Sequence, residues 1–252
     1  MTKSLGAVAL AALLALAATP AGAGPLADAA KANPVPLMID HAGDADSAKL
    51  LQSLIGAAPA TIKTTGRFTW DVARGDIVNP VGDTVATVSG GDLEAQLGRV
   101  QGVIDKWTAL RALERFAASH PLDTRLEPGD DIHHTGERVT LLVGGNRHPY
   151  FTLINLAADG TVNFLYPVED GKTHDSQTIP PGGPYKLELT VTPPFGADHF
   201  IAVASAAPLT ELHGELKAID GKQEAASILD LFDKYLAGQD WQIGLHAVFS
   251  AK

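Results

Sequence analysis

The sequence of 252 residues contains no cysteine. This absence excludes disulfide bonds, thiolate metal sites, cysteine nucleophiles and lipid attachment through an N-terminal cysteine. Aromatic residues are sparse, at 6%, whereas the apolar share of 45% is ordinary for a globular protein. The chain is therefore long and apolar enough to bury a real hydrophobic core, but it does so without cysteine chemistry.

Sequence patterns of common catalytic, binding and membrane segments are also missing. No G-x-S-x-G elbow is present to position a serine nucleophile. Ser89-Gly90-Gly91 precedes a predicted helix, but it lacks the lysine and the spacing of a phosphate-binding loop. The main apolar run, residues 5–18, is shorter than the ~20 residues that cross a bilayer. These absences disfavour a serine hydrolase of that type, a nucleotide-binding P-loop and a membrane span.

The chain has fewer basic than acidic residues. The chain has 19 Lys and Arg residues against 29 Asp and Glu residues, which gives a formal net charge of -10. An acidic surface repels phosphate backbones and anionic lipid headgroups, so binding to nucleic acid or to a membrane surface is disfavoured. The simplest role of this charge is solubility.

The first residues have the pattern of a secretory signal. Lys3 supplies a positive start, residues 5–18 are rich in Leu and Ala, and Ala21-Gly22-Ala23 offers a small-x-small cleavage pattern. We therefore predict a signal peptide over residues 1–23, a mature chain that starts near Gly24, and a periplasmic or secreted protein. Residues 24–34 are expected to form a flexible leader.

Residues 35–120 are predicted to form a small α/β unit. Short strands are expected over residues 36–40, 68–72, 76–78 and 84–88, and a first helix over residues 44–55. Asp92 can cap a long helix up to Ser119, because apolar residues recur every three or four positions and Pro121 disfavours helix before it. This helix is expected to cover the unit or to link it to the next one.

Residues 121–252 are predicted to form a β-rich module. Alternating strands are expected within residues 137–167, with a hairpin at Asp159-Gly160, and over residues 185–191. The apolar run at 199–205 predicts a central strand, and residues 224–236 and 241–249 a closing helix and strand. The fold class is therefore α+β: a small α/β unit followed by a β-sandwich-like, immunoglobulin-like module with a C-terminal helix and strand.

Two polar groups contain residue types that occur in functional sites. Asp131, His133 and His134 carry ligand types that suit zinc, but adjacent histidines rarely reach one ion and a turn explains the aspartate. His148, His174 and Asp175 lie on predicted loops and form a possible interaction surface; without a positioned serine they are no catalytic triad. We therefore assign no catalytic, metal or cofactor residue.

Three segments are similar to one family. The runs at residues 137–143 and 150–156, and the D-G-x-V-x-x-L-Y-P pattern at residues 159–167, resemble the bacterial domain of unknown function 4384 family. The resemblance extends over about residues 121–250 and includes Ile179-Pro180 and the residues Phe195-Gly196-Ala197-Asp198. In that family the module often follows a caspase-like (peptidase C14) domain, and elsewhere it accompanies kinase-like or envelope domains.

The resemblance implies no catalytic residues for this chain. A predicted secretion signal stands where the peptidase domain would be, and a caspase-like enzyme needs a cysteine that this sequence lacks. We predict a non-enzymatic protein-interaction or envelope module with an unidentified protein partner. Two alternatives are a regulatory partner of a caspase-like or kinase-like protein, and a small-ligand-binding protein with a cleft between the two units, lined by Trp70 or Trp107.

Overall fold

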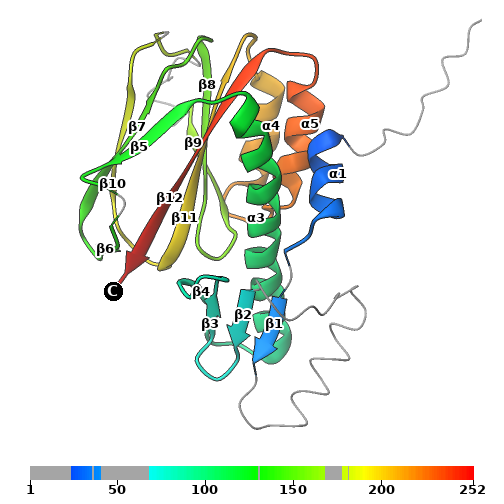
Figure 1. The fold of residues 1–252 in the computed structure, drawn as a ribbon, viewed down its shortest axis with the longest axis vertical. Coiled ribbons are helices and arrows are strands. Elements are labelled where there is room, and N and C mark those ends of the chain that lie inside the picture. Colours follow the sequence, from blue (N-terminus) through cyan, green and yellow to red (C-terminus); the bar gives the residue numbers. More distant parts are fainter. Residues whose placement is uncertain (1–23, 36, 41–67, 130, 168–177, 181) are drawn as a thin grey trace, which may run out of the picture.

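The computed structural model describes residues 24–35, 37–40, 68–129, 131–167, 178–180 and 182–252. The fold is α+β, and its largest part has three layers (Figure 1). A small antiparallel sheet packs on one face of a larger sheet, and helices cover the other face. Within the described residues, no helix is long and apolar enough to cross a membrane.

The larger sheet runs in the order β1-β2-β3-β4-β11-β12-β6, and β8 pairs with both β11 and β9. Its strands are β1 (Leu37–Asp40), β2 (Phe68–Asp71), β3 (Asp76–Val78), β4 (Thr84–Thr87), β6 (His133–His134), β8 (Tyr150–Leu156), β9 (Val162–Tyr166), β11 (Gly196–Ser205) and β12 (Trp241–Ala251). The smaller sheet has the order β10-β7-β5, with β5 (Asp123–Glu127), β7 (Arg138–Gly144) and β10 (Tyr185–Thr190). The two sheets form the sandwich-like arrangement that the strand pattern predicts.

The central strand β11 is buried on both faces, which explains its continuous apolar run. Phe200, Ala202 and Ala204 belong to the core between the two sheets. Ile201 and Val203 alternate with them and belong to the core under the helices. Each face therefore takes every second residue, as the period of a β-strand requires.

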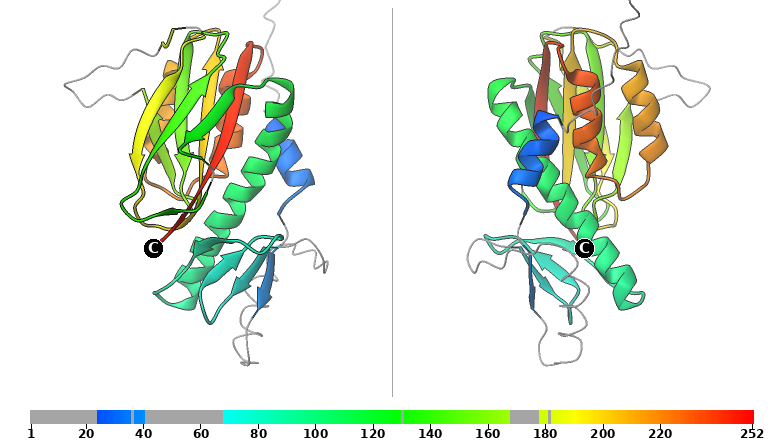
Figure 2. Two further views of the ribbon diagram at one scale, coloured as in Figure 1. Left: turned by 60° about the vertical axis from the view of Figure 1, so that its left-hand side comes forward. Right: turned by 90° about the vertical axis from the view of Figure 1, so that its right-hand side faces the viewer.

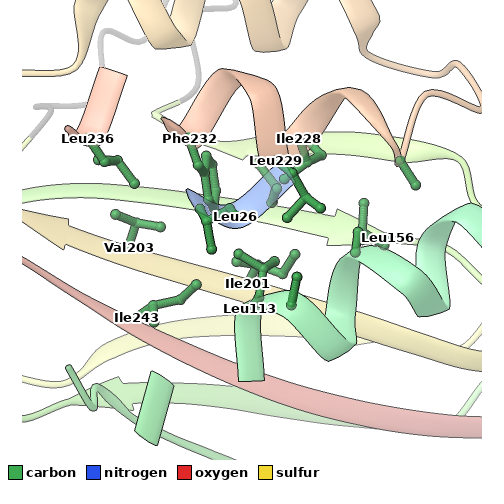
Figure 3. Packing of buried hydrophobic residues seen from close by; sticks show 14 of the residues in the cluster. Leu26, Leu113, Leu156, Ile201, Val203, Ile228, Leu229, Phe232, Leu236 and Ile243 are labelled. Carbon is green, nitrogen blue, oxygen red and sulfur yellow. The ribbon is translucent and has the colours of Figure 1, made fainter. Parts of the chain in front are cut away.

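The helices are α1 (Pro25–Ala32), α3 (Leu93–Ser119), α4 (Thr210–Ile219) and α5 (Ser227–Leu236). Figure 3 shows Leu26, Leu113 and Phe232 from three of them converging on Ile201 and Val203 of β11. α4 was not predicted, although Leu209, Leu212, Leu216 and Ile219 have helical spacing. The predicted C-terminal helix is therefore the second of two, and it begins at Ser227.

Residues 24–34 differ from the flexible leader that their composition indicates. They contain α1, which lies beside α3 and α5 (Figure 2). Leu26 is 1% exposed and belongs to the main core. The expectation was wrong because an alanine-rich segment carries little periodic signal, whereas burial of one leucine against a distant helix orders it.

The strands β1–β4 pack on the first half of α3, and the second half of α3 packs on the sandwich. Val100 and Val103 contact the core of Trp70 and Ile77, whereas Leu110 and Leu113 belong to the core under the helices. Asp92 caps α3 as predicted, because its side chain accepts a hydrogen bond from the Ala95 N–H. One helix thus contributes to two hydrophobic cores. The helix predicted over residues 44–55 lies outside the described residues.

The hairpin at Asp159-Gly160 joins β8 to β9 as predicted. Gly160 has a φ of 88°, and a Cβ built on it would lie 2.3 Å from the carbonyl oxygen of Gly102 in α3. Glycine is therefore required at this position for two reasons: the positive φ of the backbone and the close approach of α3.

Candidate functional site

His133 and His134 hold a strand in place. The Nδ1 atom of His133 lies 3.3 Å from Glu137 Oε2, and its Nε2 atom lies 3.1 Å from the Gly129 carbonyl oxygen. His134 points elsewhere, with Nδ1 3.0 Å from the Lys252 carbonyl oxygen. The His134 backbone N–H, assisted by His133, lowers the pKa of the Glu137 carboxyl. These contacts anchor β6 and the adjacent turn.

The candidate metal residues do not converge. His133 is buried, whereas His134 and Asp131 are exposed. No cluster of three His, Cys, Asp or Glu side chains with ligand spacing occurs in the described ranges.

His148 is largely buried and contacts an exposed carboxylate. Its Nε2 atom lies 3.2 Å from Asp240 Oδ2, without the geometry of a hydrogen bond, and the Asp240 side chain is 62% exposed. Arg147 lies 3.9 Å from the same carboxylate. His174 and Asp175 lie outside the described residues, so the interaction surface predicted with them stays a prediction.

Trp70 and Trp107 pack against hydrophobic cores, and neither lines the two grooves described below. Trp70 is fully buried, and the Trp107 ring packs against Phe68 at 5.1 Å and His199 at 4.8 Å between ring centroids. A groove of about 940 Å³ nevertheless lies between β4 and the sandwich, and we call it the junction groove. Its walls are Asp83, Thr84, Thr87, Ser89, Ile132, Pro193, Pro194, Phe195, Gly196, Phe249, Ser250, Ala251 and Lys252.

A fully buried lysine lies where α3 meets the sandwich. Lys106 Nζ donates a hydrogen bond to the Ala157 carbonyl oxygen at 2.9 Å and another to the Ala197 carbonyl oxygen. Ala157 follows β8 and Ala197 lies at the start of β11. The lysine therefore joins two strands of the larger sheet to the helix that carries both cores.

Burial and opposite charge act against each other at this lysine. Burial lowers the Lys106 pKa to about 8, and the carboxylates of Asp198 and Asp159 oppose that shift. Burial raises the pKa of Asp198 to about 6, and Lys106 opposes that shift in turn. Burial, followed by the charge of Lys106, holds the pKa of His199 well below its usual value. The cluster favours one positive charge and one carboxylate rather than a charged imidazole.

Asp198 lines a second groove, of about 410 Å³, which we call the lateral groove. Within its lining, Asn163 Nδ2 donates a hydrogen bond to Asn155 Oδ1 at 2.8 Å. The lining includes two acids and no basic residue: Val139, Asn155, Asn163, Phe164, Leu165, Leu189, Thr190, Val191, Thr192, Asp198, Phe200, Asp220, Val248 and Ser250. The groove therefore combines apolar side chains with polar and acidic ones.

The strand β10 borders the lateral groove and is an edge of the smaller sheet. The Val191 N–H donates a hydrogen bond to the Glu137 carbonyl oxygen, so the backbone groups of Val191 face β7. Because these groups alternate in direction along a strand, the register of β10 with β7 means that its other odd-numbered residues also face β7. The backbone groups of Lys186, Glu188 and Thr190 therefore face outward, and no described residue pairs with them. In contrast, the outer edge of β9 is covered where Val162 bonds to Lys222 and Phe164 to Asp220.

Sequence reasoning overlooked Lys106, although a signal was present. Val103, Lys106, Leu110 and Leu113 follow one another at spacings of three and four, so the lysine falls on an apolar helix face. A charge at such a position indicates a buried partner. Asp198 gives no comparable signal, because it precedes the apolar run at 199–205 as the last residue of the family pattern Phe195-Gly196-Ala197-Asp198.

Comparison with known proteins gives one match. Residues 133–208, from β6 to just before α4, match the model of a family described as "Domain of unknown function (DUF4384)". This match confirms the resemblance drawn from the strands at residues 137–167. No curated protein and no solved structure matches the chain.

Proposed function

Residues 133–208 of this chain belong to the DUF4384 family, and from that premise we propose that the protein is a non-enzymatic interaction module that binds a partner strand at β10. The observation that carries this proposal is the open edge of β10. Three outward backbone positions on that strand have no described partner, while its other edge is fully paired with β7. Sheet edges of this kind accept extended peptides through main-chain hydrogen bonds.

The lateral groove supplies specificity for such a strand. A strand added beside β10 would extend the smaller sheet, and its inward side chains would face the groove beside Leu165 and Leu189. Asp198 and Asp220 line the same groove, and no Lys or Arg lines it. Lys106 already acts on the carboxylate of Asp198, so the exposed Asp220 is the acid left for a partner. The partner chemistry that fits is a segment of alternating apolar residues in which one inward position is Lys or Arg.

A proline substitution tests the backbone role. Glu188→Pro removes an outward N–H but leaves the β7 pairing of Leu187 and Leu189 intact, and proline is tolerated at sheet edges. The matched control, Glu188→Ala, removes the same side chain and keeps the N–H. A library of displayed peptides of about eight residues would be selected for binding to the mature protein. The affinity of a selected peptide would then be measured for the wild type and for each variant.

We expect the selected peptides to alternate apolar residues around one basic position. Glu188→Pro should weaken binding at least tenfold, whereas Glu188→Ala should stay within twofold of the wild type. Asp220→Asn, which keeps the oxygen that accepts a hydrogen bond from the Phe164 N–H, should remove the preference for Lys or Arg. Selection of no peptide, or equal loss in both Glu188 variants, would contradict strand addition at β10.

We propose that the protein acts in the periplasm or outside the cell. The support is the signal pattern of Lys3, the apolar residues 5–18 and Ala21-Gly22-Ala23. Fusion of residues 1–30 to a reporter enzyme tests it, and a reporter that stays cytoplasmic would refute it. The family resemblance makes secreted or envelope-associated segments of caspase-like and kinase-like proteins the first partners to test.

The junction groove favours one second candidate, small-ligand binding between the two units. Its volume of about 940 Å³ falls in the range of ordinary ligand sites, and both units line it. The test is a thermal-shift screen with small molecules on the wild type and on Thr84→Trp, which would fill the groove. A compound that raises the melting temperature of both proteins equally does not bind there.

A further inference from the structure

One carboxylate binds the start of the first described helix across the whole sequence. Asp233 of α5 accepts hydrogen bonds from the Leu26 N–H, at 3.0 Å, and from the Ala27 N–H, at 2.9 Å. Free N–H groups at a helix start need acceptors, and Gly24 at the N-cap has no side chain to offer one. Asp233 therefore does for α1 what a capping side chain usually does.

Gly24 lies against this carboxylate. A Cβ built on Gly24 would lie 2.3 Å from Asp233 Cγ and 2.5 Å from its Oδ2. The Gly24 Cα therefore lies within about 4 Å of that oxygen, and the Gly24 nitrogen, one bond of about 1.5 Å from the Cα, lies within about 5.5 Å of it. No side chain fits at this position, although its φ of -74° is open to any residue. The close approach itself is what requires glycine.

Gly24 is also the residue that the signal pattern places first in the mature chain. Ala21-Gly22-Ala23 is the small-x-small pattern that precedes cleavage. Hydrolysis of the Ala23–Gly24 bond by a signal peptidase adds the elements of water: Ala23 becomes a carboxylate, and the Gly24 amine takes up a proton. A new positive charge then arises next to Asp233.

We propose that the α-ammonium released at Gly24 by cleavage forms an ion pair with Asp233, so that removal of the leader fixes α1 onto α5. The proposal rests on the secretion signal and is independent of strand binding at β10. A bare positive charge at the start of a helix is unfavourable, because the helix dipole is positive there. Asp233 reverses the sign of that effect, and Leu26 then stays seated among Ile228, Leu229 and Phe232 (Figure 3).

The experiment compares two forms with the same net charge. One is the protein produced by processing of the full precursor and starting at Gly24. The other retains a Ser-Ala pair ahead of Gly24, which moves the ammonium away from Asp233 and keeps every other residue. Both forms are made with Asp233 and with Asp233→Asn, which keeps the shape of the side chain and loses its charge.

With Asp233, the form that starts at Gly24 should melt about 2–4 °C above the extended form, the shift of a charge-assisted contact in a chain of this length. With Asp233→Asn, the difference should vanish or reverse. Equal melting temperatures with Asp233, or the same difference in both backgrounds, would overturn the proposal even if secretion is confirmed. Mass spectrometry of the secreted protein is the separate check, and a mature chain that starts elsewhere would overturn the maturation step.

Discussion

The buried amine of Lys106 gives the sharpest stability prediction. In the native state burial lowers its pKa to about 8, whereas the pKa of a lysine in an unfolded chain is about 10.4. Between these values the unfolded chain binds more protons than the native protein, so stability rises with pH. Lys106→Met removes the titrating group and keeps a side chain of similar length.

The magnitude follows from the same two pKa values. Relative to Lys106→Met, the wild type should gain about 2–3 kcal/mol of unfolding free energy between pH 7 and pH 10. At pH 7 the variant loses donors to the carbonyls of Ala157 and Ala197 but is relieved of a buried charge. These effects oppose each other, and we expect a net loss of about 1–2 kcal/mol there.

Urea unfolding at pH 7, 8, 9 and 10 checks this prediction. Tryptophan fluorescence is a suitable signal, because Trp70 is fully buried and Trp107 is largely packed beside the lysine. Tyrosine and surface lysine residues titrate in both proteins, so their effects cancel in the difference. A difference between wild type and variant that is constant to within about 0.5 kcal/mol over this range would refute the reasoning, since the lysine would then keep its proton.

Two further predictions concern single residues. Gly160→Ala should lower the unfolding free energy by about 3 kcal/mol or more in the same urea titration, because the new Cβ would collide with the backbone of Gly102. Gly221 also has a positive φ, but a Cβ there would meet open space, so Gly221→Ala should lower the unfolding free energy by only about 1 kcal/mol. Similar losses in the two variants would show that the positive φ alone, and not the collision with Gly102, causes the loss of stability. His148→Ala should change the melting temperature by less than about 2 °C, because the Asp240 carboxylate that it contacts is 62% exposed and makes no hydrogen bond to it; a larger drop would assign this histidine a role in the fold.

Local pattern predicted much of the fold. The strands at residues 68–71, 76–78 and 84–87, the cap at Asp92 and the Asp159-Gly160 hairpin occur where alternation, capping and turn chemistry place them. These features depend on neighbours within a few positions, so the sequence contains their cause. The missed helix α4 belongs to the same class, because its leucine spacing was readable.

The candidate site depended on contacts that no local pattern contains. Lys106 is buried because the carbonyls of Ala157 and Ala197, far along the chain, meet it. Among the described residues β10 has an open edge, because β7 pairs with one side only, while the similar strand β9 is closed by the α4–α5 connection. Alternation predicts each strand but not its neighbours, since sheet order arises from long-range packing.

The sequence by itself determined the absence of cysteine chemistry, the acidic charge, the signal pattern and the family of residues 133–208, because each is a property of residue identity or short spacing. Only the tertiary structure decided that α1 is held by Asp233, that Asp198 lines a groove, and that no described residue pairs with the outer edge of β10. The physical reason is that an ordered leader, a shifted pKa and an unpaired edge are set by which distant groups are brought within a few ångströms of one another.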